Sequence, residues 1–191
     1  MGISDRDKWN RIYGSGTPHS TAARVLADFE HLLPAAGRAL DLACGAGGNA
    51  LLLAQHGLET WAWDISDTAV AQLQALAREN NLSITVQQRD VVRQPPDPGS
   101  FDVIVVSRFL DRDLIPAISR AMRDHGLIFY QTFVREKPSG CGPSNPEYLL
   151  DVNELLFLFK SLRIIYYREE GNIGDTARGF RSEAMLIAQK P

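Results

Sequence analysis

The stretch Ala39–Ala54, which reads ALDLACGAGGNALLLA, decides the fold of this chain. An apolar run reaches Leu42, glycines follow at positions 45, 47 and 48, and a second apolar run has the length of a short helix. Glycine adopts positive φ angles without steric cost and lets a backbone approach a ligand closely. Gly45, Gly47 and Ala50 match the dinucleotide pattern G-x-G-x-x-G/A, which does not by itself choose a cofactor. The stretch therefore predicts a strand, a nucleotide-binding turn and a helix.

The composition indicates one compact domain. The chain has 191 residues, of which 45% are hydrophobic, and this suits a single sizeable core. The formal charge of −3 and the dispersed Lys and Arg residues offer no basic surface for phosphate backbones, so we expect no nucleic-acid partner. Cys44 and Cys141 are too few for a disulfide framework or a metal site, and we expect reduced thiols and no metal.

The chain shows no pattern of membrane insertion. Residues 1–8 are charged and lack the apolar segment of a signal peptide, and no later apolar run has the length of a membrane span. We therefore expect a cytoplasmic protein without membrane contact.

Helical and strand patterns alternate along most of the chain. This alternation predicts an α/β fold with a doubly wound, mostly parallel sheet. The residues of the segment 103–106 are all apolar, as expected of a parallel strand covered on both faces. We expect helices over residues 4–13, 21–32, 48–56, 66–79, 114–122 and 152–162, and strands over residues 38–42, 58–63, 83–88, 101–106, 127–132, 163–168 and 184–189.

Polar residues gather where the carboxyl ends of these strands meet. Ligands of doubly wound folds bind at that edge, where the strand order reverses. Asp64, at the end of the second strand, suits a bidentate contact with two ribose hydroxyls. A charged Asp41 beside the turn disfavours a pyrophosphate and favours a cationic ligand. S-adenosylmethionine carries an ammonium and a sulfonium but no phosphate.

Three segments together resemble a known family. Residues 41–49 (DLACGAGGN), 64–66 (DIS) and 89–91 (RDV) resemble the class I S-adenosylmethionine-dependent methyltransferases. The similarity is strongest to the small tellurite-resistance and thiopurine-methyltransferase-like branch. The resemblance implies a three-layer, Rossmann-like sheet of seven strands, in which the last strand, residues 184–189, lies antiparallel beside the fifth.

The same resemblance assigns the cofactor-binding residues. Asp41 and the turn at residues 45–47 would hold the methionine portion, Asp64 the ribose, and Asp90 with Val91 the adenine. Ala43 stands where the family often has glycine. The full predicted set is Asp41, Ala43, Cys44, Gly45, Gly47, Asn49, Asp64, Ile65, Asp90, Val91 and Ser107, with Ser107 at the front face of the cofactor.

The acceptor side is less well marked. We expect Tyr13, His19, Arg108 and Arg181 there, with Tyr130 and Gln131 as further candidates, because these residues follow strands or lie in the first segment or the last hairpin. Trp9 and Tyr13 lie one turn apart and either cover the cofactor or simply pack. The segment 140–146 is either a flap over the acceptor or a rigid connection.

These observations predict a single methyltransferase domain over residues 1–191. We expect a helical lid segment at 1–36, a cofactor-binding core at 37–135, and a loop, a helix and a strand pair at 136–191. The predicted reaction transfers a methyl group from S-adenosyl-L-methionine to a small-molecule acceptor, a thiol or a chalcogen compound of the tellurite or selenite type, and releases S-adenosyl-L-homocysteine. Two alternatives remain at this point: a nicotinamide-dependent oxidoreductase and a non-catalytic nucleotide-binding module.

Overall fold

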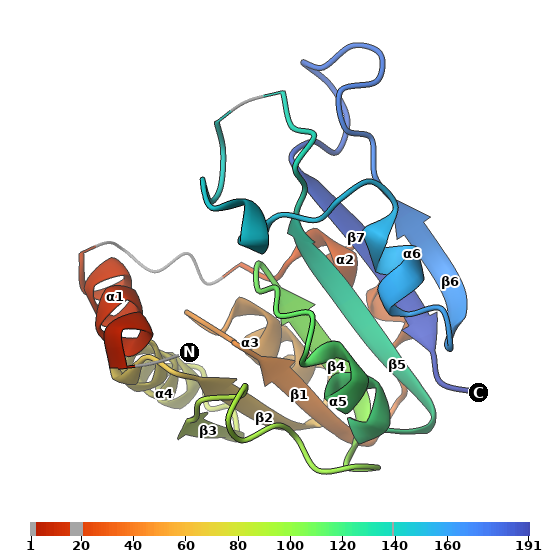
Figure 1. Cartoon of the computed structure of the whole chain (residues 1–191). Helices are drawn as coiled ribbons and strands as arrows, with labels where there is room; N and C mark the ends of the chain where they lie inside the picture. Colours follow the sequence, from red (N-terminus) through yellow and green to blue (C-terminus); the bar gives the residue numbers. More distant parts are fainter. Residues whose placement is uncertain (1–2, 16–20, 139) are drawn as a thin grey trace.

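A computed structural model describes residues 3–15, 21–138 and 140–191, and it contains one seven-stranded sheet between two layers of helices (Figure 1). The strands are β1 (Arg38–Leu42), β2 (Glu59–Asp64), β3 (Ile84–Gln88), β4 (Phe101–Ser107), β5 (Met122–Phe133), β6 (Arg163–Arg168) and β7 (Glu183–Gln189). The α-helices are α1 (Ile3–Gly14), α2 (Arg24–Ala27), α3 (Gly48–Gln55), α4 (Asp67–Glu79), α5 (Ile115–Ala121) and α6 (Glu154–Leu158). Two 3-10 turns, η1 (Glu30–Leu32) and η2 (Pro146–Tyr148), complete the set.

The strand order is β3-β2-β1-β4-β5-β7-β6. The pairs from β3 to β5 are parallel, and β7 is antiparallel to both β5 and β6. The predicted fold class is therefore confirmed, including the antiparallel last strand beside the fifth. The order reverses between β1 and β4, so the carboxyl ends of these two strands flank the place where doubly wound folds bind ligands.

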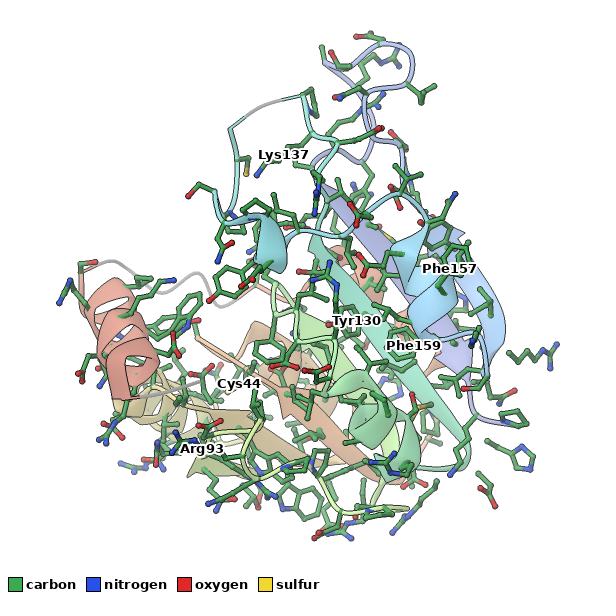
Figure 2. The ribbon with its side chains drawn as sticks, viewed as in Figure 1. Cys44, Arg93, Tyr130, Lys137, Phe157 and Phe159 are labelled. Atoms are coloured by element: carbon green, nitrogen blue, oxygen red, sulfur yellow. The ribbon has the colours of Figure 1, made fainter. Side chains whose placement is uncertain are left out.

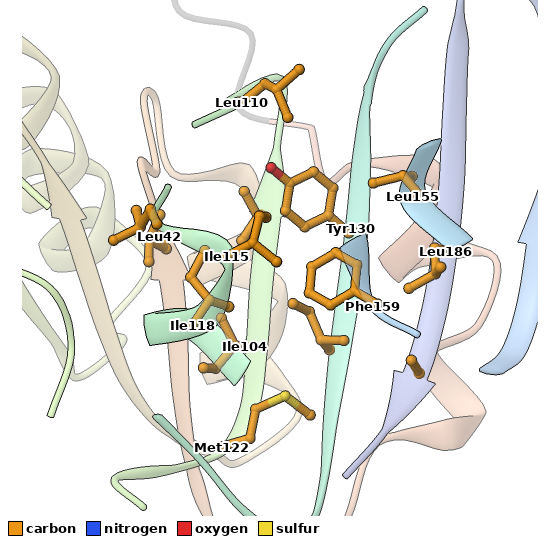
Figure 3. Packing of buried hydrophobic residues seen from close by; sticks show 14 of the residues in the cluster. Leu42, Ile104, Leu110, Ile115, Ile118, Met122, Tyr130, Leu155, Phe159 and Leu186 are labelled. Carbon is orange, nitrogen blue, oxygen red and sulfur yellow. The ribbon is translucent and has the colours of Figure 1, made fainter. Parts of the chain in front are cut away.

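Strand β4 shows why the sheet is covered on both faces. Ile104 and Val106 belong to the core under α5 and α6, whereas Val103 and Val105 belong to the core under α2 and α3. Side chains alternate between the faces of a strand, so a run of four apolar residues needs a helical layer on each side. Figure 3 shows the first of these cores, in which Tyr130 and Phe159 pack together with a ring separation of 5.4 Å.

Two predicted helices are shorter in the structure. The helix expected at 21–32 is divided into α2 and η1, and the helix expected at 152–162 is only α6. The N–H of Ala23 donates to Oδ1 of Asn49, and the N–H of Val25 donates to Oε1 of Gln131, so distant side chains fix where α2 begins. Asn153 precedes α6 in the left-handed region with φ of 61°.

The fifth strand is longer than expected. It runs over Met122–Phe133 rather than 127–132, and its pairing with β4 contains a register shift between Phe101 and Val103. His125 lies at this irregular end with a φ of 64°. An irregularity of this kind lets a strand continue past a local break in the hydrogen-bonding ladder.

Helix α1 packs on the sheet layer through α4 (Figure 1). Arg6 pairs with Asp67, Oγ of Ser66 donates to Oδ1 of Asn10 at 2.7 Å, and Nε2 of Gln72 donates to the carbonyl of Tyr13 at 3.0 Å. These contacts bring α1 beside the end of β2. Across residues 3–15, 21–138 and 140–191, no helix combines the length and the apolar character that a membrane span requires.

Candidate functional site

A cavity of about 590 Å³ opens at the carboxyl ends of β1, β2 and β4, between α1 and the loop that follows β5. Its lining combines the glycine turn, the ends of three strands, one face of α1 and the segment around residues 142–148. The described residues that line it are Lys8, Trp9, Ile12, Tyr13, Thr21, Ala43, Cys44, Gly45, Ala46, Gly48, Asn49, Asp64, Ile65, Arg89, Val91, Ser107, Arg108, Phe109, Leu110, Phe133, Gly142, Pro143 and Tyr148.

The turn after β1 depends on positive φ angles. Gly45 has a φ of 51° and Gly47 a φ of 80°. A Cβ at position 45 would overlap the Tyr13 hydroxyl, and a Cβ at position 47 would overlap the Leu73 side chain. Gly45 thus leaves room for Tyr13 of α1, and Gly47 leaves room for Leu73 of α4. Gly45 lines the cavity, whereas Gly47 is not among the described lining residues, and its predicted ligand contact stays a prediction.

Asp64 is the acidic group that faces the cavity. Its Oδ2 accepts from the N–H of Gly45 and its Oδ1 accepts from the N–H of Ser66, both at 2.8 Å. Burial raises the pKa of Asp64 and these backbone donors lower it. A carboxylate offers about four acceptor positions, and these bonds do not fill all of them. The carboxylate is thus held in one orientation and can still accept hydrogen bonds from a ligand.

Asp41 lies beneath the turn and not on the cavity surface. The side chain is fully buried, accepts from Nδ2 of Asn49 at 3.2 Å and accepts from the N–H of Ala50 at 3.1 Å. Burial raises the pKa of Asp41 to about 7, although the bonds from Asn49 and Ala50 lower it. Asp41 therefore reaches the cavity only through Asn49 and the backbone of the turn, and its predicted role toward the methionine portion stays a prediction.

Asn49 connects three parts of the site. Its Nδ2 donates to Asp41 and, at 3.0 Å, to Oγ of Ser107, while its Oδ1 accepts from the N–H of Ala23 at 2.8 Å. Both Asn49 and Ser107 line the cavity. A neutral amide can bind a carboxylate, a hydroxyl and a backbone N–H at once, since it carries both donors and an acceptor.

Burial also governs two groups near the turn. The pKa of the Cys44 thiol is raised well above its usual value by burial and, further, by Asp41 and Asp64. The pKa of Tyr13 is raised by burial first and by Asp64 second, with Arg108 exerting a small opposing effect. Both groups are therefore neutral near pH 7, and Cys44 is a packing residue rather than a nucleophile.

The segment after β3 contributes one predicted residue and not the other. Val91 is buried against the cavity and Ile65 lines it as well. The side chain of Asp90 binds the backbone of its own loop, since Oδ1 accepts from the N–H groups of Val92 and Arg93 at 3.1 and 3.2 Å. Asp90 is not among the described residues of the cavity lining, and its predicted adenine contact stays a prediction.

Among the predicted acceptor-side residues, Tyr13 and Arg108 line the cavity. Arg181 does not. It donates to the carbonyls of residues 170, 171, 175 and 178, so it binds the hairpin from which it arises, and that prediction is wrong. His19 lies outside the described residues. Tyr130 is fully buried and donates to the carbonyl of Phe109 at 2.8 Å, so it supports the wall from behind.

The mouth of the cavity is lined by residues that the sequence reading did not single out. Nζ of Lys8 lies 5.6 Å from the centre of the Trp9 ring and 5.4 Å from that of Tyr148, which joins α1 to η2. Phe133 lines the wall beneath Gly142 and Pro143. The spacing of Trp9 and Tyr13 indicated that they lie one turn apart in a helical segment. No pattern in the neighbouring sequence indicated that Tyr148 would lie beside them.

The loop over the cavity is held by one lysine. Nζ of Lys137 donates to the carbonyls of Cys141 and Pro143 at 2.7 and 3.0 Å. Figure 2 shows Lys137 in the arch above the carboxyl ends of the strands. Across the described residues, no group of three or more His, Cys, Asp or Glu side chains could hold a metal ion.

The residues present fit S-adenosylmethionine. The Gly45 turn lines the cavity, Asp64 offers two oriented acceptors, and Ile65 with Val91 provides an apolar surface for a base. This fold and this turn resemble those of the class I S-adenosylmethionine-dependent methyltransferases. Residues 39–126 match the family model described as a methyltransferase domain.

A curated relative is similar over part of its length. The chain is 32% identical over 91 residues to the probable S-adenosyl-L-methionine-dependent methyltransferase TehB of Haemophilus influenzae. The aligned part covers 46% of this chain and 32% of that protein, so the chain spans about a third of the length of the curated relative.

Solved structures share the fold. The crystal structure of TehB from Haemophilus influenzae aligns with a TM-score of 0.71 at 22% identity, over 97% of this chain and 67% of that one. Geranyl diphosphate C-methyltransferase from Streptomyces coelicolor, solved with Mg²⁺, geranyl diphosphate and S-adenosyl-L-homocysteine, aligns with a TM-score of 0.72 at 13% identity over the whole of both chains.

Proposed function

We propose that this protein transfers the methyl group of S-adenosylmethionine to a small-molecule acceptor in the cytoplasm, and that the acceptor is a thiol or a chalcogen compound of the tellurite or selenite type. The observation that carries the proposal is Asp64, whose two oxygens are oriented by Gly45 and Ser66 at the edge of the cavity. The partial similarity to TehB, a probable S-adenosyl-L-methionine-dependent methyltransferase, supports the methyl donor, and the choice of acceptor class rests on the resemblance of the sequence motifs.

The residues would divide the work as follows. Asp64 would bind the ribose hydroxyls, the Gly45 turn the methionine portion, and Ile65 and Val91 the adenine, while Ser107 would face the reacting end. S-adenosylmethionine supplies an electrophilic methyl carbon, and its sulfur keeps the electron pair of the broken bond. Because displacement at a sulfonium needs alignment and exclusion of water more than a protein nucleophile, the walls of the cavity are the main contribution of the chain.

Helix α1 and the loop at 140–148 would close the site. Trp9, Ile12, Phe133 and Tyr148 present apolar surface on either side of the mouth. A thiol acceptor loses its proton readily near neutral pH, so this chemistry requires no strong general base. We therefore assign residues 3–14 to a lid of the single domain, as the sequence suggested for residues 1–36.

Calorimetry tests the proposal. Wild-type protein should bind S-adenosylmethionine and S-adenosylhomocysteine, and Asp64→Ala should weaken this binding roughly tenfold to hundredfold, since hydrogen bonds to a charged group are lost. Asp124→Ala is the matched control, because that exposed carboxylate pairs with Lys190 at 3.4 Å and is not among the described residues of the cavity lining. Binding of NAD without binding of the sulfonium compounds would favour the oxidoreductase alternative and contradict the proposal.

Product detection separates catalysis from mere binding. Thiols, selenite and tellurite should yield methylated products and S-adenosylhomocysteine. Cofactor binding without any methyl product across these acceptors would instead support a non-catalytic module.

A further inference from the structure

Arg108 has an unusual backbone at the wall of the cavity. It follows β4 with a φ of 54°, and its N–H donates to the carbonyl of Gln131 at 2.8 Å. The left-handed region is unfavourable for a residue with a Cβ, and such conformations persist only where the surroundings enforce them. The backbone thus turns the side chain of Arg108 toward the cavity that it lines.

A chain of hydrogen bonds holds this side chain from behind. Nε of Arg108 donates to Oε1 of Glu183 at 2.9 Å, and Oε2 of Glu183 accepts from Nε2 of Gln131. Oε1 of Gln131 accepts from the N–H of Val25 at 2.8 Å. Glu183 and Gln131 are buried, whereas the side chain of Arg108 is 65% exposed. The network therefore holds the guanidinium through Nε and leaves Nη1 and Nη2 without a hydrogen bond to Glu183.

Nη1 and Nη2 of Arg108 are available for a ligand. Within the described residues, Nη1 and Nη2 of Arg108 make no hydrogen bond. Phe133 and Tyr148 line the same cavity, which makes most of its acceptor side apolar. Lys8 also carries a positive charge at the mouth, while Asp64, the acid that lines the cavity, lies at the cofactor end. A guanidinium fork beside apolar walls matches a carboxylate on an otherwise apolar molecule.

We propose that Arg108 binds a carboxylate of the methyl acceptor, and that Glu183 and Gln131 position its guanidinium for this contact. The inference rests on the proposed function, since it names the acceptor chemistry of the same site. It makes Arg108 a specificity-determining residue, while Glu183 and Gln131 act through it.

The test compares 3-mercaptopropionate with its neutral amide, 3-mercaptopropionamide. Binding of each to the protein loaded with S-adenosylhomocysteine is measured by calorimetry, and methyl transfer to each is measured separately. Arg108→Gln should weaken binding of the carboxylate roughly tenfold to hundredfold and raise its KM similarly, with no change for the amide. Arg135→Gln is the control, because Arg135 is an exposed arginine paired with Asp151 at 3.1 Å and is not among the described residues of the cavity lining.

Glu183→Gln separates positioning from packing. This variant keeps the charge of Arg108 but weakens its anchor, so KM for the carboxylate should rise severalfold while kcat and the values for the amide stay constant. A merely structural role would change both substrates alike. Urea unfolding of each variant shows whether the fold is retained, and Arg108→Lys, which keeps the charge without the fork, should recover part of the affinity.

Each result bears on a distinct claim. Equal binding of carboxylate and amide by wild-type protein, or equal losses for both in Arg108→Gln, overturns the carboxylate proposal even when methyl transfer is observed. Arg108-dependent binding of the carboxylate without any methyl product supports the anion site and contradicts the proposed function. Arg108-dependent binding of tellurite without binding of 3-mercaptopropionate assigns the guanidinium to an inorganic oxyanion and overturns the proposal.

Discussion

Nδ2 of Asn49 lies 3.2 Å from Oδ1 of Asp41, which ties the first turn of α3 to the acid of β1 beneath the cofactor turn. The same amide also binds Ser107 and the N–H of Ala23. One neutral side chain therefore holds together β1, β4 and the start of α2.

Replacing this amide should destabilise the protein. We expect Asn49→Ala to lower the free energy of unfolding by about 1–3 kcal/mol, because buried polar partners lose their hydrogen bonds. Urea denaturation measures the change. Asn172→Ala, at an exposed position of the β6–β7 hairpin, is the control and should have little effect. Equal stabilities of the two variants would show that the three contacts of Asn49 contribute little.

The buried carboxylate of Asp41 should make stability depend on pH. Its pKa is about 7 in the folded protein, against 3.8 as the ordinary value, mainly because of burial. The folded state then binds more protons than the unfolded state between these values, so stability is highest at the acidic end of this range and falls as pH rises through about 7. The slope contributed by one group is at most about 1.4 kcal/mol per pH unit.

Urea unfolding at pH 5, 6, 7 and 8 checks this prediction. Asp41→Asn cannot ionise, so its stability should fall less with rising pH than that of the wild type, beyond a constant offset from one altered hydrogen bond. Parallel profiles would mean that Asp41 ionises without difficulty in the folded protein.

Gly47 should tolerate no side chain, for two separable reasons. Its φ of 80° strains any L residue by about 1–2 kcal/mol, and a Cβ would overlap Leu73, which adds about 1–3 kcal/mol of overpacking. Gly57→Ala is a matched control, since Gly57 has a φ of 98° and no atom within 4 Å of an added Cβ. We expect Gly47→Ala to destabilise the protein more than Gly57→Ala does.

A double-mutant cycle isolates the overlap. In a Leu73→Ala background the cost of Gly47→Ala should fall to that of Gly57→Ala, as measured by urea unfolding. An unchanged cost in that background would assign the whole effect to backbone strain.

Ala43 should accept glycine. Its φ of 56° destabilises a residue with a Cβ by about 1–2 kcal/mol, and glycine removes this strain. The greater entropy of glycine in the unfolded chain offsets about 0.5–1 kcal/mol of that gain. Ala43→Gly should therefore leave stability unchanged or raise it by up to about 1 kcal/mol in thermal or urea unfolding. Ala50→Gly, within α3, should cost about 1 kcal/mol. A loss in both variants would show that the Cβ of Ala43 packs usefully.

Local patterns were enough to predict the sheet. A few neighbouring residues determine the structure of the apolar segment of β4 and of the glycine turn. The start of α2 was not predictable in this way, because Asn49 and Gln131 fix it from distant positions. The helix expected at 152–162 ends early as α6, on which the side chain of Phe157 is exposed (Figure 2).

The sequence predicted where the site lies but not which of its carboxylates face the cavity. Asp64, Val91 and Arg108 line the cavity as their places after strands suggested. Asp41 and Asp90 follow the same rule of position, yet their carboxylates bind neighbouring backbone groups. A sequence indicates which strand end an acid occupies but not whether it faces the cavity, since Asp64 lines the cavity while it binds two backbone N–H groups and Asp41 is fully buried.

The insertion of β7 between β5 and β6 constrains the order of assembly. β6 precedes β7 in the chain but has β7 as its neighbour in the sheet. During synthesis, β6 therefore emerges before its pairing partner exists. The helical core around β1 and β4 has its contacts earlier in the chain, so we infer that the edge of the sheet beyond β5 is completed in one late step that recruits two strands together.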